Sequence, residues 1–110
     1  MVINCNIGGN VIRDVLVDNG SSADILMAKA FRQMNLGDLV LEPATNPLCG
    51  FGGRKVKALC EISLQVSFGE ISNPRTEFIT FDVVDVNYPY NAILGKEHSM
   101  RSKPLYNQHI

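Results

Sequence analysis

The feature that most constrains the fold is a long alternation of apolar and polar residues in the middle of the chain. Every second residue from Val56 to Phe68 is apolar, and most of the residues between them are polar or charged. The apolar set is Val56, Ala58, Cys60, Ile62, Leu64, Val66 and Phe68. A period of two places such a set on one face of a β-strand. The pattern predicts a half-buried strand, or a bent pair of strands, that covers a core with one face.

Short apolar runs separated by turn residues predict further strands. "VINCNI" and "VIRDVLV" flank "GGN" and predict an N-terminal hairpin. "LCGFGGRKVKALCEISLQVSFG" has two strand-like arms around a glycine cluster. "TEFITFDVVDV" is a mixed aromatic and β-branched strand, and "NYPYNAILG" is a proline turn followed by a short apolar strand. Turns spaced about 8–12 residues apart are typical of a small barrel or sandwich.

One segment favours a helix. "ADILMAKAFRQMNLG" contains several good helix formers, and Gly37 can end the helix. Met27, Phe31 and Met34 are near helical spacing, so we expect them to face the core. "EPATNP" and "ISNPR" are expected to be a loop and a turn, and the tail 96–110 is polar and weakly patterned. The fold class expected for residues 1–110 is therefore a single mainly β domain with one short helix.

Composition narrows the classes of function. The chain has 110 residues, 45% of them apolar, and a net charge of −1, which gives no electrostatic footprint for nucleic acid. No apolar run is long enough for a membrane span, and the N-terminus lacks the pattern of a signal peptide. We therefore expect an intracellular, cytoplasmic protein. Cys5, Cys49 and Cys60 lack close spacing and are expected to be free thiols in a reducing compartment.

The stretch "VLVDNGSSADIL" poses the main functional question, because an apolar run leads directly into Asp18. Asn19-Gly20 would suit a tight hairpin turn, and this interpretation stays open. Asp18, Gly20, Ser22 and Asp24 alternate as in a calcium loop. Ala23 and Lys29, however, stand where that loop needs a glycine and a glutamate, so calcium is set aside.

Other catalytic and binding motifs are poorly supported. Ser21 and Ser22 would need a base, yet the two histidines, His98 and His109, lie in the weakly patterned tail. No histidine–cysteine group has zinc spacing, and Gly95-Lys96 lacks the rest of a phosphate-binding loop. No metal or cofactor is therefore expected.

Three features taken together resemble one family. An Asp-x-Gly follows an apolar strand, a glycine-rich "GFGG" lies downstream, and "AILG" comes near the end. In this order they resemble the retropepsins, the aspartic proteases of retroviruses and LTR retrotransposons. The amino-acid sequences of these segments look most like those of proteases in plant Ty3/gypsy-type polyproteins. The resemblance runs from Val11 to Gly95 and implies a small closed acid-protease barrel with a flap hairpin.

The resemblance also implies a mechanism. Retropepsins hydrolyse peptide bonds with two aspartates that activate one water, and this chain contains a single Asp-x-Gly. An active enzyme would therefore be a homodimer with Asp18 from each subunit, processing its own polyprotein in the cytoplasm or in a retroelement particle. The family pattern assigns the active-site loop to Asn19, Gly20, Ser21 and Ser22, the flap to Gly50, Phe51, Gly52 and Gly53, and packing beneath the loop to Leu94, Gly95 and Lys96.

Two departures from the family pattern support an alternative. Asn19 stands where most relatives carry a threonine or serine that ties the two subunits together, and an amide is longer and planar. The tail after Gly95 is polar where the family usually has a short apolar helix. The alternative is a non-catalytic retropepsin-like barrel that serves as a dimerisation or peptide-binding module.

Overall fold

The computed structural model describes residues 1–18, 23–34, 48–51, 54–70 and 73–95. These residues form seven strands and one short helix. The elements are β1 (Val2–Ile7), β2 (Asn10–Val17), β3 (Ile25–Met27), α1 (Ala28–Gln33), β4 (Leu48–Phe51), β5 (Arg54–Glu70), β6 (Asn73–Val84) and β7 (Ala92–Leu94). The mainly β class with a single short helix is therefore confirmed for the described part of the chain.

Six of these strands close into a barrel. Hydrogen-bonded neighbours follow the order β1-β2-β7-β3-β6-β5, and β1 also pairs with β5 through Asn6↔Ser67 and Ile7↔Val66. That last pairing returns the sheet to its first strand. Strand β4 lies outside the closed circuit and pairs with β5.

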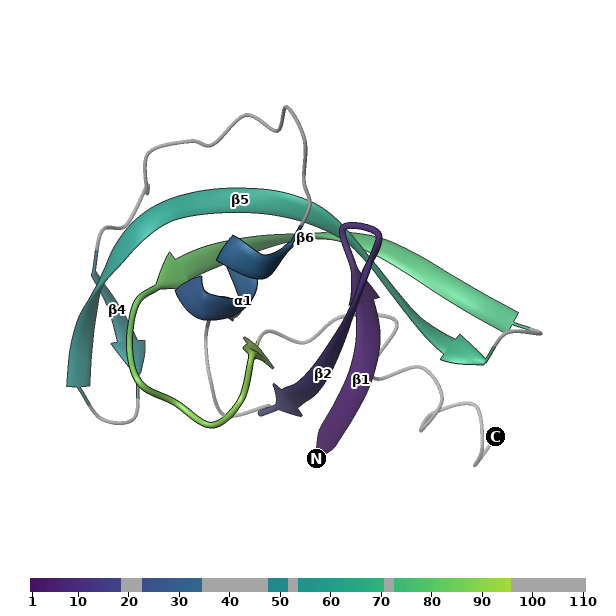
Figure 1. Ribbon diagram of the computed structural model, residues 1–110, viewed down its shortest axis with the longest axis horizontal. Coiled ribbons are helices and arrows are strands. Elements are labelled where there is room, and N and C mark those ends of the chain that lie inside the picture. Colours follow the sequence, from purple (N-terminus) through teal and green to yellow (C-terminus); the bar gives the residue numbers. More distant parts are fainter. Residues whose placement is uncertain (19–22, 35–47, 52–53, 71–72, 96–110) are drawn as a thin grey trace, which may run out of the picture.

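The alternating segment forms one long bent strand rather than a pair of strands. β5 pairs antiparallel with β6 over almost its whole length, with an irregularity between Ala58 and Cys60. Figure 1 shows the two as a curved pair that arches over the rest of the molecule. Ile62, Leu64 and Val66 are buried, whereas Ser63 and Gln65 are exposed, as the period of two requires. β6 begins at Asn73, so the expected turn "ISNPR" is already part of a strand at its last three residues.

The N-terminal hairpin is confirmed, and its turn explains the two glycines. Gly8 and Gly9 have positive φ angles of 59° and 87°, which suits the mirror-image turns that match strand twist. Asn6 Oδ1 accepts a hydrogen bond from the Gly9 N–H at 3.0 Å, which closes the turn. A side chain at either glycine would meet the steric cost of the left-handed region.

A β-bulge interrupts strand β2 three residues after this hairpin turn. Arg13 and Asp14 together oppose Asn4 on β1, and Asp14 adopts a φ of 57°. Three hydrogen bonds brace the bulge. The Asp14 N–H donates to Asn4 Oδ1 at 3.2 Å, the Asn91 N–H donates to Asp14 O at 2.9 Å, and Asn91 Nδ2 donates to Arg13 O at 2.6 Å. Asn91 directly precedes β7, so the bulge fixes where β7 begins to pair with β2.

Strands β3 and β7 are buried on both faces. Leu26, Ala92 and Leu94 join the main core inside the barrel, around Phe81. Their neighbours in sequence form a second apolar cluster on the other face of these strands: Ile25, Met27, Val84 and Ile93, with Leu16, Ala23, Val56, Val86 and Tyr88 partly buried against them. Burial on both faces explains why "ILM" and "AIL" are continuously apolar instead of alternating.

The expected helix is much shorter than its sequence signal, because its first part is a strand. Ile25, Leu26 and Met27 form β3, which pairs parallel with β6 and antiparallel with β7. The barrel provides hydrogen-bond partners on both sides of this segment, and this outweighs its modest helix propensity. Helix α1 then covers only Ala28–Gln33. Met27 and Met34 are buried and Phe31 packs partly against the core, as expected.

Helix α1 is tied to the loop that precedes β7. Lys29 Nζ donates to Tyr88 O at 2.8 Å, and Arg32 forms an exposed ion pair with Asp85 at 3.2 Å. An exposed pair of this kind contributes little to stability. Gly37, the loop "EPATNP" and the tail 96–110 lie outside the described residues.

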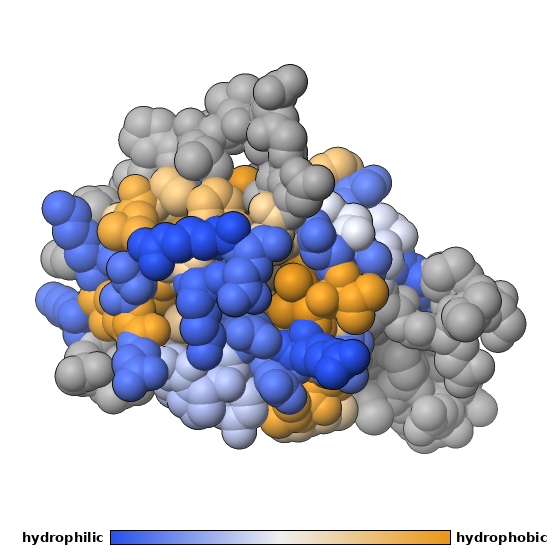
Figure 2. All heavy atoms as spheres, in the orientation of Figure 1, coloured by the Kyte–Doolittle hydropathy of each residue, from blue (hydrophilic) through white to orange (hydrophobic). Residues whose placement is uncertain are grey.

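The described surface is mixed in character. On the face shown in Figure 2, hydrophilic side chains separate the apolar patches from one another. The exposed apolar side chains of the described residues include Val11 and Phe78. None of the described residues belongs to a helix with the length and apolar character needed to cross a bilayer.

We predict that Asn91→Ala lowers the free energy of unfolding by about 1 kcal/mol, because it removes the side-chain hydrogen bond that braces the bulge. Urea denaturation followed by circular dichroism measures this change. The matched control is Asn87→Ala, an exposed asparagine in the same loop, which we expect to change stability by less than about 0.5 kcal/mol. Equal effects of the two substitutions would contradict a bracing role for Asn91.

Candidate functional site

Asp18 lies at the C-terminal end of β2, where the strand leaves the barrel. Val17 pairs in parallel with Leu94, and the Asp18 N–H donates to Leu94 O at 3.0 Å. The backbone of Asp18 is therefore held by the last strand of the barrel, while its side chain is exposed. A carboxyl group on a fixed backbone with access to solvent can contact water, a substrate or another subunit.

The segment that follows Asp18 links two strands that do not pair with each other. β7 lies between them, parallel to β2 and antiparallel to β3. A tight hairpin at Asn19-Gly20 would make β2 and the next strand direct neighbours. β2 and β3 therefore do not form the hairpin that this interpretation requires, because both strands pair instead with β7. Asn19-Gly20 itself lies outside the described residues.

The far end of this segment is fixed by a buried acid. Among the described residues, Asp24 is the only polar or charged residue that is buried, with 2% of its surface exposed. Asp24 Oδ1 accepts a hydrogen bond from the Gly95 N–H at 2.9 Å. Asp24 O accepts another from the Asp82 N–H at 2.9 Å, which starts the pairing of β3 with β6. Segment 18–24 is thus fixed at both ends by Leu94 and Gly95.

The structure brings three of the predicted site residues together, namely Asp18, Leu94 and Gly95. Asn19, Gly20, Ser21, Ser22 and Lys96 lie outside the described residues, so their predicted roles stay predictions. The histidines considered as partners for a serine nucleophile, His98 and His109, also lie outside them.

The predicted flap residues are divided between a strand and its connection. Gly50 and Phe51 belong to β4, and Phe51 pairs with Arg54 as the last pair before the connection between β4 and β5. Gly52 and Gly53, which connect these strands in the sequence, lie outside the described residues. Among the described strands β4 pairs only with β5, and Figure 1 shows this hairpin at the left edge of the molecule. The hairpin thus extends from the barrel, and its role as a flap stays a prediction.

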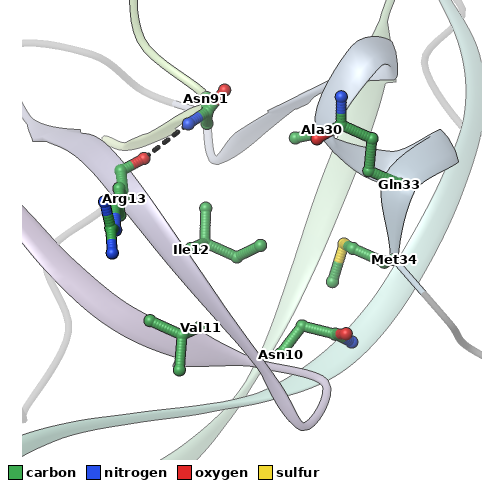
Figure 3. Close-up of a pocket in the computed structure, with 8 residues that line it drawn as sticks. All are labelled: Asn10, Val11, Ile12, Arg13, Ala30, Gln33, Met34 and Asn91. Atoms are coloured by element: carbon green, nitrogen blue, oxygen red, sulfur yellow. Dashed lines mark hydrogen bonds between the residues drawn. The ribbon is translucent and has the colours of Figure 1, made fainter.

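A pocket of about 310 Å³ lies at the opposite end of β2 from Asp18. Figure 3 shows Ile12 pointing from β2 toward Met34, with Asn10, Gln33 and Asn91 around them. None of the predicted site residues that the structure describes lines this pocket, and Asp18 lies at the other end of the strand.

The described thiols are poorly suited to nucleophilic chemistry. Cys5 is buried, Cys60 is half-buried, and both are free. Burial raises the pKa of Cys5 to about 11, and burial also raises the pKa of Cys60. The reactive form of cysteine is the thiolate, so both residues are held in the unreactive form near neutral pH. The described residues also contain no cluster of three or more histidine, cysteine or acidic side chains able to hold a metal ion.

Sequence reasoning did not assign a role to two residues that shape this site. In the sequence, Asp24 falls in a pattern that resembles a calcium loop, and Asn91 belongs to a proline turn. A weak local signal exists for Asp24, since an acid placed directly before the apolar run "ILM" is liable to be drawn into the core. Its partner, Gly95, is far away in sequence and is revealed only by the fold.

Comparison of the chain with protein-family models, with curated proteins and with solved structures finds no match in any of the three.

We predict that Cys5 makes the protein less stable at alkaline pH. The pKa of Cys5 is about 11 in the folded state and 9.0 ordinarily, so the folded chain keeps a proton that the unfolded chain loses. Stability is therefore complete below the ordinary value and falls as pH rises from 9.0 to about 11. Urea denaturation across this window should show a steeper decline for the wild type than for Cys5→Val. Identical slopes would assign the decline to other groups.

Proposed function

We propose that this chain is an aspartic endopeptidase of the retropepsin type, acting as a homodimer in which Asp18 of each subunit contributes one carboxyl group. The observation that carries the proposal is the arrangement of segment 18–24. Asp18 has a fixed backbone and an exposed side chain at the end of a barrel strand, and Leu94-Gly95 holds both ends of the segment. Two of the three motifs that resemble the family, the one that begins at Asp18 and "AILG", thus contact each other through the backbones of Asp18 and Leu94.

A single barrel supplies half of the required machinery. Hydrolysis by this mechanism needs two carboxyl groups that share one proton, and the chain has one Asp-x-Gly. A second copy related by a two-fold axis supplies the other carboxyl group at the same position. The exposure of Asp18 in one chain is compatible with this, because the partner carboxyl group must approach it.

The reaction proceeds by general acid–base catalysis. One carboxylate removes a proton from the bound water, and the water oxygen forms a bond to the scissile carbonyl carbon. The protonated partner carboxyl donates its proton to the carbonyl oxygen, which gives a neutral tetrahedral intermediate. Transfer of a proton to the peptide nitrogen then accompanies cleavage of the C–N bond. The β4–β5 hairpins close over an extended peptide, which binds through main-chain hydrogen bonds and side-chain pockets.

The natural substrate in this proposal is the polyprotein that encodes the protease. The amino-acid sequence supports this substrate, because its motifs resemble those of proteases in plant Ty3/gypsy-type elements. The alternative is a non-catalytic dimerisation or peptide-binding module, and Asn19 favours it. The cleavage experiment below distinguishes this module from the enzyme.

We predict that Asp18→Asn abolishes cleavage of a mixed peptide library at mildly acidic pH, because an amide neither accepts the proton of water nor shares one with its partner. Mass spectrometry measures the products, and a pepstatin-type inhibitor should suppress wild-type cleavage. The matched control is Asp14→Asn, which makes the same chemical change at another exposed acid of β2. Asparagine also tolerates the positive φ at this position. Binding without cleavage by a folded, dimeric wild type would instead support the module.

We predict that mixing wild type with Asp18→Asn exposes the shared site. Random pairing of equal amounts leaves about one quarter of the dimers with two intact carboxyl groups. Specific activity of the equilibrated mixture should therefore fall to about one quarter of the wild-type value at the same total concentration. A value of about one half would contradict the dimer, because it is the result for subunits that act alone. Sedimentation of each sample provides the oligomeric state.

A further inference from the structure

The carboxyl group of Asp24 contacts the same peptide group that holds Asp18. The Leu94–Gly95 peptide accepts the Asp18 N–H through Leu94 O at 3.0 Å. Its other end, the Gly95 N–H, donates to Asp24 Oδ1 at 2.9 Å. A peptide group is planar and rigid, so these two hydrogen bonds are coupled in orientation. One peptide therefore connects the backbone of Asp18 with the side chain of Asp24.

The two hydrogen bonds also reinforce each other electrostatically. An acceptor carboxyl draws the N–H of the peptide toward it and increases the negative partial charge on the carbonyl oxygen. The carbonyl oxygen then becomes a stronger acceptor for the Asp18 N–H. This effect is larger in a buried site than in water, and the hydrogen bond from Gly95 to Asp24 is buried.

Burial of Asp24 is difficult to explain by packing alone. Its neighbours Ala23 and Ile25 are both packed in the second apolar cluster, so the acid stands in an apolar stretch of the chain. Burial of a polar group is unfavourable unless hydrogen bonds replace those made with water. The carboxyl group is instead satisfied through Gly95, which fixes the start of β3 against the end of β7 in one register.

We propose that Asp24 is a positioning residue for Asp18, acting through the Leu94–Gly95 peptide. This inference rests on the proposed protease function. Asp24 has no contact with substrate in this scheme. It attaches the start of β3 to the peptide group that holds the Asp18 backbone, so that Asp18 keeps its position at the end of β2. A small misplacement of a catalytic group greatly reduces the rate of the chemical step, whereas it changes the affinity for substrate much less.

The test compares a substitution that removes the hydrogen-bond acceptor with one that keeps it. Asp24→Leu removes the acceptor and keeps a similar size, whereas Asp24→Asn keeps an oxygen that can accept the Gly95 N–H. We expect kcat to fall about 10- to 100-fold in Asp24→Leu, with KM changed by less than about threefold. Asp24→Asn should keep kcat within about threefold of the wild-type value, because its amide oxygen can still accept the hydrogen bond. Ile79→Ala, in the barrel core, is the control for general loss of stability.

A second measurement tests the two hydrogen bonds of the Leu94–Gly95 peptide without depending on catalytic activity. Amide hydrogen exchange by NMR reports the Asp18 and Gly95 N–H groups directly. We expect both to exchange at least about tenfold faster in Asp24→Leu, with most protection kept in Asp24→Asn. In Ile79→Ala, exchange should instead increase by a common factor across the core amides.

The outcomes separate the two proposals. Absence of cleavage by the wild type would overturn the protease, while the exchange data would still decide whether Asp24 controls the Asp18 amide. An active Asp24→Leu with wild-type kcat, or an Asp18 amide that exchanges as in the wild type, would overturn the positioning role. If Asp24→Leu does not fold, Asp24→Asn decides. In Asp24→Asn, a wild-type kcat together with faster hydrogen exchange at the Asp18 amide would also overturn the positioning role of Asp24.

Discussion

The insertion of β7 between β2 and β3 is the constraint on which the rest of the structure depends. Without it, β2 would pair with the next strand in sequence and the barrel could not close in the observed order. Because β7 is only Ala92–Leu94, it has few hydrogen bonds with which to fix its register. Asn91 at its start and the Leu94–Gly95 peptide at its end provide the additional contacts.

These contacts connect fold and function through one strand. At its N-terminal end, β7 is attached to the bulge of β2, where Asp14 adopts an unusual positive φ. At its C-terminal end, it holds both ends of segment 18–24. A shift of β7 by one residue would exchange its two faces, because the side-chain period is two, and would move Leu94 away from Asp18. The position of the proposed catalytic carboxyl group thus depends on the same β7 register that buries the apolar side chains of the core.

The placement of Asp24 shows why a buried acid can suit a barrel that is otherwise closed by apolar residues. Apolar packing alone is tolerant of small shifts, since one aliphatic contact substitutes for another. A carboxyl group that accepts a particular N–H is satisfied in one arrangement only. Here that arrangement ties β3 to the end of β7, close to the residue that we propose performs the chemistry.

The sequence by itself determined the mainly β class, the N-terminal hairpin, the half-buried face of β5 and the short strand "AIL", because alternation, turn glycines and short apolar runs are local properties. It also singled out Asp18 through a local motif. Tertiary structure alone decided that Ile25–Met27 is a strand, that β2 and β3 do not pair with each other, and that Asp24 meets Gly95. Each of these depends on a strand more than sixty residues away filling the space between β2 and β3, and no local pattern records such a distant partner.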